Sequence, residues 1–225
     1  MIKLVFATLV KPPYVRIRGA VQTAMFDRRY GVETEGLVST ADAGVTDPHS
    51  MHYLPAGVLS LRRILPPSSV GPDDVFVDFG SGKGRIVLQA ALHYPFRAVY
   101  GVELSESLHT VAERNVATLR DRFRCPEVHL LQGDARTVDL PDDVTVVYLY
   151  NPFRGAVFAD VVDRLIASVD RNPRRMRIVY GNPEEEAALL ATGRVRLLRA
   201  TRGWRPSREW SRSNSFRLYE VTPRS

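Results

Sequence analysis

Short apolar runs and amphipathic stretches alternate along most of the chain. Runs rich in β-branched and aromatic residues predict buried strands, and they lie at 75–79, 98–103, 128–131, 144–150 and 177–180. Apolar residues that recur every three or four positions predict helices, and these lie at 58–65, 86–94, 105–123, 157–169 and 183–190. Strands that alternate with helices in this way are typical of an α/β domain built on a parallel sheet.

The last two apolar segments, 195–201 and 216–221, are not separated by a helical pattern. They predict a closing hairpin. With the five strands before them, they give a seven-stranded sheet whose last strand is antiparallel. The length of 225 residues suits one such domain with a substantial core.

The first 55 residues are the hardest to interpret. The sequence Lys11-Pro12-Pro13 is expected to break any early element, because proline fixes φ and lacks an N–H donor. Residues 31–50 are rich in glycine, threonine, serine and aspartate, which indicates a loop. We expect residues 1–55 to form a segment that covers a site or contacts a substrate, and 56–225 to form the domain. A disordered linker is the alternative for the loop.

Three glycines at alternate positions follow the strand at 75–79 and lead into a helix: Gly80, Gly82 and Gly84. Such glycines let the backbone turn sharply and let a ligand approach without interference from a Cβ atom. The helix start adds unpaired N–H groups and the positive end of a dipole. A dinucleotide-binding motif, G-x-G-x-x-G, requires glycine where this chain has Arg85. A tight structural turn is the other interpretation.

Asp78 stands two residues before the first of these glycines. An acidic residue followed by G-x-G-x-G resembles the first motif of the class I S-adenosylmethionine (SAM) methyltransferases. SAM carries an ammonium and a sulfonium, so a carboxylate beside the loop has positive charge to meet. The resemblance implies SAM as the cofactor, a Rossmann-like fold with an N-terminal lid segment, and the following cofactor-binding residues in this stretch: Asp78, Gly80, Ser81, Gly82 and Gly84.

Two later stretches extend the resemblance. Glu103 ends the second predicted strand 19 residues past Gly84, the distance at which a strand end brings an acid to a ribose. The turn at 132–135 resembles the one that holds the adenine in this family, where a carboxylate accepts from the exocyclic amine. A surface glutamate and an ordinary Gly-Asp turn are the alternatives. In these stretches and next to them, we expect the following further residues to bind the cofactor: Tyr53, Glu103, Leu104, Gly133, Asp134, Ala135 and Asn151.

Asn151-Pro152-Phe153 follows the fourth predicted strand, where the methyl group is expected to lie. It resembles a shortened form of the N-P-P-[FY] motif of enzymes that methylate amides and amines. In that motif the asparagine oxygen and a backbone carbonyl orient an NH₂ group. We expect Asn151, Pro152 and Phe153 to be catalytic. His49 and His52 are candidate bases, of which His52 is favoured. No third ligand accompanies these two histidines, so no metal is expected.

A closer likeness is to the non-SET histone lysine methyltransferases of the disruptor-of-telomeric-silencing type. It is carried by 75–84, 87–91 and 101–103, and by Asn151 and Phe153. The likeness is confined to the cofactor half of the chain. It favours nitrogen as the atom that receives the methyl group.

Charge adds one further candidate. The formal net charge is +6, with 28 arginines and three lysines, which permits a polyanionic partner without requiring one. Eight arginines lie between Arg194 and Arg217, with Trp204 and Trp210 among them. Arginines with aromatic residues can bind phosphates and stack on bases. A solvated hairpin or a loop that faces the substrate is the interpretation we favour.

A single cysteine, Cys125, excludes an intramolecular disulfide and a cysteine-rich metal site. No apolar run approaches the roughly 20 residues that span a bilayer. The apolar stretch at 4–10 lacks the cleavage site of a signal peptide, so we expect a cytoplasmic protein.

These observations predict a SAM-dependent methyltransferase that acts on a nitrogen or oxygen of a small-molecule acceptor. The first alternative is a protein N-methyltransferase that acts on lysine or another amine. A non-catalytic module that binds SAM or a nucleotide is the second, and an NAD-dependent oxidoreductase is the third. A nucleic acid is a less favoured substrate, and no membrane partner is expected.

Overall fold

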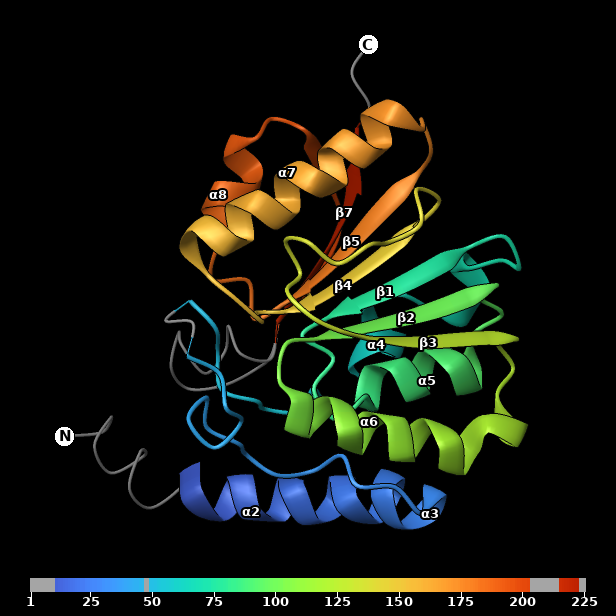
Figure 1. The fold of residues 1–225 in the computed structure, drawn as a ribbon, viewed down its shortest axis with the longest axis vertical. Coiled ribbons are helices and arrows are strands. Elements are labelled where there is room, and N and C mark those ends of the chain that lie inside the picture. The colour runs from blue at the N-terminus through green and yellow to red at the C-terminus, as the bar shows by residue number, and fades with distance from the viewer. Residues whose placement is uncertain (1–10, 47–48, 203–214, 223–225) are drawn as a thin grey trace, which may run out of the picture.

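A computed structural model describes residues 11–46, 49–202 and 215–222, and it shows one sheet with helices on both faces (Figure 1). The strands are β1 (Val75–Phe79), β2 (Ala98–Glu103), β3 (Glu127–Gln132), β4 (Val146–Tyr150), β5 (Met176–Gly181), β6 (Val195–Thr201) and β7 (Phe216–Val221). The α-helices are α2 (Lys11–Gln22), α3 (Arg28–Tyr30), α4 (Ser60–Ile64), α5 (Arg85–His93), α6 (Glu106–Leu119), α7 (Gly155–Arg171) and α8 (Glu186–Ala191). A π-helical turn, η2 (Thr23–Asp27), and two 3-10 turns, η3 (Pro67–Ser69) and η4 (Arg120–Arg122), complete the elements. The predicted strands and helices are all present, with ends that shift by a few residues.

The seven strands form a single sheet in the order β3-β2-β1-β4-β5-β7-β6. β1 to β5 are parallel, and β7 runs antiparallel to both of its neighbours. The seven-stranded α/β sheet with an antiparallel last strand is therefore confirmed. The last strand in the chain does not extend the sheet but lies between β5 and β6.

Each face of the sheet has its own apolar core, because side chains alternate along a strand. Phe76 and Val146 face the core of α4, α5 and α6, whereas Val75 and Val147 face the core of α7 and α8. All four of these side chains are fully buried. Figure 1 shows α5 and α6 on one side of the sheet and α7 and α8 on the other.

The N-terminal region differs from the prediction. The expected break at Lys11-Pro12-Pro13 is wrong, because α2 begins at Lys11. Both prolines therefore occupy the first helical turn, where the backbone N–H groups have no acceptor within the helix and their loss costs little. The helix continues through η2 and α3 and ends at Gly31, whose φ of 69° requires a left-handed conformation.

The topology places one crevice at the carboxyl ends of the strands. The chain leaves β1 toward β2 on one side, and β4 pairs with β1 on the other side. Ligands of open α/β sheets bind outside the strand ends at such a switch point. Among the described residues, no helix is both long and apolar enough to cross a membrane, and no group of three or more metal-binding side chains occurs.

Candidate active site

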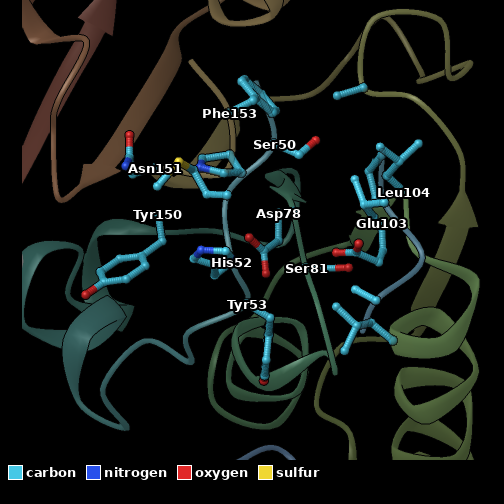
Figure 2. A pocket seen from close by; sticks show the side chains of 18 of the residues that line it. Ser50, His52, Tyr53, Asp78, Ser81, Glu103, Leu104, Tyr150, Asn151 and Phe153 are labelled. Carbon is cyan, nitrogen blue, oxygen red and sulfur yellow. The ribbon is translucent and has the colours of Figure 1, made fainter. Parts of the chain in front are cut away.

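A pocket with an empty volume of about 1050 Å³, its open mouth included, lies at the carboxyl ends of β1 to β4 (Figure 2). Residues within 40–45 and the stretch 50–56 line it from the N-terminal region. The structure brings together nearly every residue that the sequence nominated: His52, Tyr53, Asp78, Gly80, Ser81, Glu103, Leu104, Gly133, Asp134, Ala135, Asn151, Pro152 and Phe153 all line this pocket. Gly82 and Gly84 lie behind its lining.

The glycine loop is packed against protein on two sides. A Cβ atom at Gly80 would lie 2.5 Å from Cβ of Pro152, and one at Gly82 would lie 2.1 Å from Cε2 of Tyr53. Both glycines also have positive φ, at 71° and 55°. The loop therefore needs glycine because of its backbone conformation and because Tyr53 and Pro152 press against it.

Two buried carboxylates face the pocket from adjacent strands. Glu103 is held in place, because its Oε2 accepts from the backbone N–H of Gly82 at 2.8 Å and its Oε1 from that of Ser105 at 2.9 Å. Asp78 is 3% exposed, and no hydrogen bond or ion pair joins its carboxylate to another residue of the described chain. Burial, and then the charge of Glu103, raises the pKa of Asp78 well above its ordinary value.

This arrangement fits SAM. Two desolvated carboxylates without a neighbouring cation are costly, and the ammonium and sulfonium of SAM carry the missing charge. The serine hydroxyl beside them, Ser81 Oγ, is also buried without a hydrogen-bond partner in the described structure. The site thus contains polar atoms whose partners a ligand would supply.

Asp134, expected to contact adenine, is paired with Arg136 in this structure. Nη2 of Arg136 lies 2.6 Å from Oδ2 of Asp134, and its Nε lies 3.0 Å from both carboxylate oxygens. The hydrogen bond from Arg136 holds the pKa of Asp134 below its ordinary value, so the carboxylate stays charged. A contact between Asp134 and adenine stays a prediction.

The end of the pocket at which the sequence predicts the acceptor is built around Asn151. This residue has a left-handed backbone, with φ of 48°, and is 4% exposed, and its Oδ1 has no hydrogen-bond partner in the described structure. The turn after it pairs with the N-terminal segment. Met51 N–H donates to the carbonyl oxygen of Pro152 at 3.2 Å, and Arg154 N–H donates to that of His49 at 3.0 Å.

His52 lies in the pocket lining but is exposed. Its Nδ1 accepts from the backbone N–H of Thr40 at 3.2 Å. A neutral imidazole that accepts at Nδ1 carries its proton on Nε2, where it is a donor. The role of His52 as a base stays a prediction, and it requires the bond to Thr40 to break.

Arg85 is the functional residue that sequence reasoning missed most clearly. Its side chain is 2% exposed and lines the pocket. It donates from Nε to Thr34 Oγ1 at 2.7 Å, from Nη1 to Gln22 Oε1 at 2.6 Å and from Nη2 to Glu35 Oε2 at 2.7 Å. Its position beside the glycine loop was visible in the sequence, but its partners lie far away along the chain.

Other residues of the lining also escaped prediction. Thr40, Ala43, Val45, Ser50 and Met51 come from the N-terminal segment, whose loop-like composition carries no sign of where it folds. Tyr148 and Tyr150 come from β4. They were interpreted only as strand residues, although a tyrosine near the carboxyl end of a central strand is a signal for a pocket wall.

The arginine-rich hairpin lies partly in the described structure. Arg194 pairs with Asp170, Arg196 with Glu220, and Arg217 with Glu186. Trp204 and Trp210 lie outside the described residues. The arginines paired in this way already have carboxylate partners, which weakens the case for a phosphate-binding surface here.

Comparisons with known proteins match the part of the chain that carries the glycine loop. A family model described as histone methylation protein DOT1 matches residues 58–134. The chain is 25% identical over 162 residues to a histone-lysine N-methyltransferase of Drosophila melanogaster, H3 lysine-79 specific, a match that covers 64% of this chain and 9% of that protein. It is 33% identical over 103 residues to a protein-lysine N-methyltransferase of Saccharolobus islandicus, covering 46% of this chain and 61% of that protein.

Solved structures resemble the chain in fold. TrmN from Thermus thermophilus matches with a TM-score of 0.54 and 19% identity, over 75% of this chain and 49% of that one. The tRNA m1G37 methyltransferase of M. jannaschii matches with a TM-score of 0.52 and 13% identity, over 77% of this chain and 51% of that one. The chain thus shares the fold of these structures, and its cofactor half resembles DOT1-type proteins over residues 58–134.

Proposed function

We propose that the protein transfers the methyl group of SAM to an amine nitrogen, with the lysine side chain of a protein as the first candidate acceptor. SAM supplies an electrophilic methyl group on a sulfonium that leaves readily. Both curated relatives named above are lysine methyltransferases, which supports a protein amine over the small-molecule acceptor expected from the sequence. The chain spans only part of the length of either relative, so the substrates in their names support the choice of acceptor and do not assign it.

The observation that carries the proposal is the pairing of the Asn151 turn with Met51. In the N-P-P-[FY] arrangement, two acceptors orient a planar NH₂ group. Here the backbone N–H of Met51 already donates to the Pro152 carbonyl oxygen, whereas Oδ1 of Asn151 is a buried acceptor without a partner in the described structure. A tetrahedral amine can donate one hydrogen bond to Asn151 and keep its lone pair directed at the methyl group.

The walls of the pocket favour the neutral form of such an amine. Met51, Tyr150, Phe153 and Val157 line it beside Asn151. An apolar environment disfavours the ammonium form and lowers the pKa of a lysine that enters it. An amine can therefore lose its proton to solvent on entry, and a dedicated base such as His52 is not required.

The proposal is tested with methyl-labelled SAM. The purified protein is incubated with labelled SAM and, separately, with the protein, RNA and small-molecule fractions of a cell lysate. We expect label in the protein fraction that is recovered as methyllysine after hydrolysis. Label that appears only among small molecules would replace lysine by the small-molecule acceptor. Binding of SAM without transfer to any fraction would leave the non-catalytic module, and a failure to bind SAM would end the proposal.

Asn151→Ala tests the acceptor turn. We expect turnover to fall by about 100-fold, a size typical of lost orientation at a reacting group, and the affinity for SAM to fall far less than turnover. The matched control is Asn182→Ala, because Asn182 also has a left-handed backbone, with φ of 47°, and does not line the pocket. If both variants lose turnover equally, backbone strain and not acceptor orientation is responsible.

A further inference from the structure

Tyr148, at the centre of β4, carries a buried hydroxyl without a hydrogen-bond partner in the described structure. Tyr148 pairs with Asp78 in the parallel register of β4 and β1, so the two side chains lie on the same face of the sheet. Tyr148 is 1% exposed and lines the pocket. Its Oη is buried and has no hydrogen-bond partner in the described structure.

A buried hydroxyl without a partner is unfavourable, and its presence indicates that a partner is missing. Burial raises the pKa of the Tyr148 hydroxyl far above its ordinary value, and the nearby hydroxyl of Ser60 lowers it. In the described structure, however, no hydrogen bond of normal geometry joins Ser60 and Tyr148. Ser60 donates its own proton to the carbonyl oxygen of Gly57 at 2.7 Å. Tyr148 therefore has a proton to donate, and no acceptor for it lies within hydrogen-bond reach in the part of the chain that the structure describes.

The other strong donor in this part of the lining is already committed. The guanidinium of Arg85 donates to Thr34, Gln22 and Glu35, as described above, and Nη1 also reaches the carbonyl oxygen of Ala56 at 3.3 Å. Among the described residues of the lining, the hydroxyls of Ser81 and Tyr148 are buried donors without a hydrogen-bond partner, and of the two Tyr148 belongs to the strand that pairs with β1 at Asp78.

The order of the strands indicates which part of SAM lies there. The predicted adenine contact, Asp134, follows β3, and the predicted ribose contact, Glu103, ends β2. The next strand ends along the sheet are those of β1 and β4, so the amino-acid tail of SAM is directed toward Asp78 and Tyr148. That tail carries one ammonium and one carboxylate.

We propose that Tyr148 binds the cofactor, donating a hydrogen bond from its hydroxyl to the α-carboxylate of SAM while Asp78 accepts from the α-ammonium. This inference rests on the proposed use of SAM and adds a residue that the glycine motif does not contain. The donor and the acceptor, one from each of two paired strands, would recognise the two charges of the tail separately.

The test compares two ligands that differ in that tail. Calorimetry measures the binding of S-adenosylhomocysteine, which has the amino-acid tail, and of methylthioadenosine, which lacks it, to wild type and to Tyr148→Phe. A hydrogen bond to a charged group predicts that the variant binds S-adenosylhomocysteine about tenfold or more weakly. Its affinity for methylthioadenosine should not change. The melting temperature of the ligand-free variant should equal or exceed that of wild type, because the unsatisfied hydroxyl is gone.

Tyr94→Phe is the matched control. Tyr94 is also buried, but its hydroxyl donates to the carbonyl oxygen of Leu65 at 2.7 Å and lies outside the pocket. This variant should melt at a lower temperature and keep the wild-type ratio of the two affinities.

Three results would overturn the role of Tyr148. They are an unchanged affinity of Tyr148→Phe for S-adenosylhomocysteine, an equal loss of affinity for both ligands, and a fall in melting temperature as large as that of the control. If wild type binds neither ligand, the proposed use of SAM is wrong. This result differs from a failure of the role of Tyr148 alone, in which wild type still binds S-adenosylhomocysteine.

Discussion

The two ends of the pocket are assembled in different ways. The cofactor end comes from consecutive elements, since β1, the glycine loop, α5 and β2 follow one another, and Glu103 binds the loop directly through the N–H of Gly82. The acceptor end joins residues 49–51 to the turn at 152–154, which lie far apart in the chain. A local motif can therefore name the cofactor, whereas the acceptor depends on a contact that only the folded chain makes.

Arg85 joins the cofactor end to the N-terminal region. It starts α5 beside the glycine loop, and it donates hydrogen bonds to Thr34 and Glu35 of the N-terminal segment. Tyr53 adds a second connection, because its hydroxyl donates to the carbonyl oxygen of Thr34 at 2.7 Å while its ring covers Gly82. Three substitutions test the contrast between the ends. One breaks the connection through Arg85, one alters Asp78 at the cofactor end alone, and one removes the ion pair of Glu33 at the edge of the N-terminal segment.

The largest effect is expected from Arg85→Gln. The change leaves Asp27 and Glu35 without the cation they face, at 3.6 Å and 2.7 Å. Removing one partner of a buried ion pair costs about 3 kcal/mol or more of the free energy of unfolding. Chemical denaturation measures that loss, and hydrogen exchange should show faster exchange at Thr34 and Glu35, whose N–H groups bond to Asp27. A loss below about 1 kcal/mol, the range of exposed pairs, would mean that the segment docks without this network.

Asp78→Asn should produce an intermediate effect confined to the cofactor end. Because the folded protein raises the pKa of Asp78, the native state binds this proton more tightly than the unfolded state does. The stability of ligand-free wild type should therefore fall as pH rises from the ordinary aspartate value through the raised one. Asp78→Asn lacks this fall in stability with rising pH, so at pH 7 the variant should melt at a higher temperature than wild type.

The same substitution should weaken the binding of SAM by roughly 10- to 100-fold at pH 7, the size of a lost hydrogen bond between charged groups. Wild-type affinity should decline as pH falls through the raised pKa, since the protonated carboxyl no longer attracts the ammonium, whereas the affinity of the variant should lack this dependence. Calorimetry between pH 5 and 8 measures both. A variant that is less stable and binds SAM normally would show that Asp78 serves the fold and not the ligand.

The smallest effect is expected from Glu33→Gln at the edge of the N-terminal segment. Lys83 Nζ lies 2.6 Å from Oε1 of Glu33, whose side chain is 67% exposed, and this hydrogen bond lowers the pKa of Glu33. An exposed pair contributes about 0.5 kcal/mol. That contribution is present above the ordinary glutamate pKa and is lost as pH falls through the lowered one. A double-mutant cycle with Lys83→Met measures it, and a coupling above about 1 kcal/mol would place this pair among the main anchors of the segment.

Most of the fold followed from the sequence because strands and helices have their own periodicity. The runs at 75–79 and 98–103 match β1 and β2 residue for residue. The start of α2 was missed because prolines usually break helices, and their tolerance in the first turn depends on where that turn begins. The position of β7 between β5 and β6 was not predictable either, since a hairpin pattern does not say which of its strands pairs with the rest of the sheet.

The candidate site divides in the same way. Asp78 is predicted from its place in the motif of an acidic residue followed by G-x-G-x-G, and Glu103 from its spacing at the end of a predicted strand. The partners of Arg85 are not, because they lie 29 to 63 positions away and belong to a segment without periodicity. The pairing of Asp134 with Arg136 and that of Pro152 with Met51 are features of the folded chain that residue types do not indicate.

The place of β7 has a consequence for synthesis of the protein on the ribosome. β5 and β6 emerge before β7, yet neither pairs with the other in the finished sheet, because β7 lies between them. Until residue 221 has left the exit tunnel, β5 is an apolar strand with one unpaired edge. Such edges pair readily with other chains. The nascent chain is therefore most prone to aggregate just before β7 emerges. A chaperone that binds the chain at this stage would act on β5.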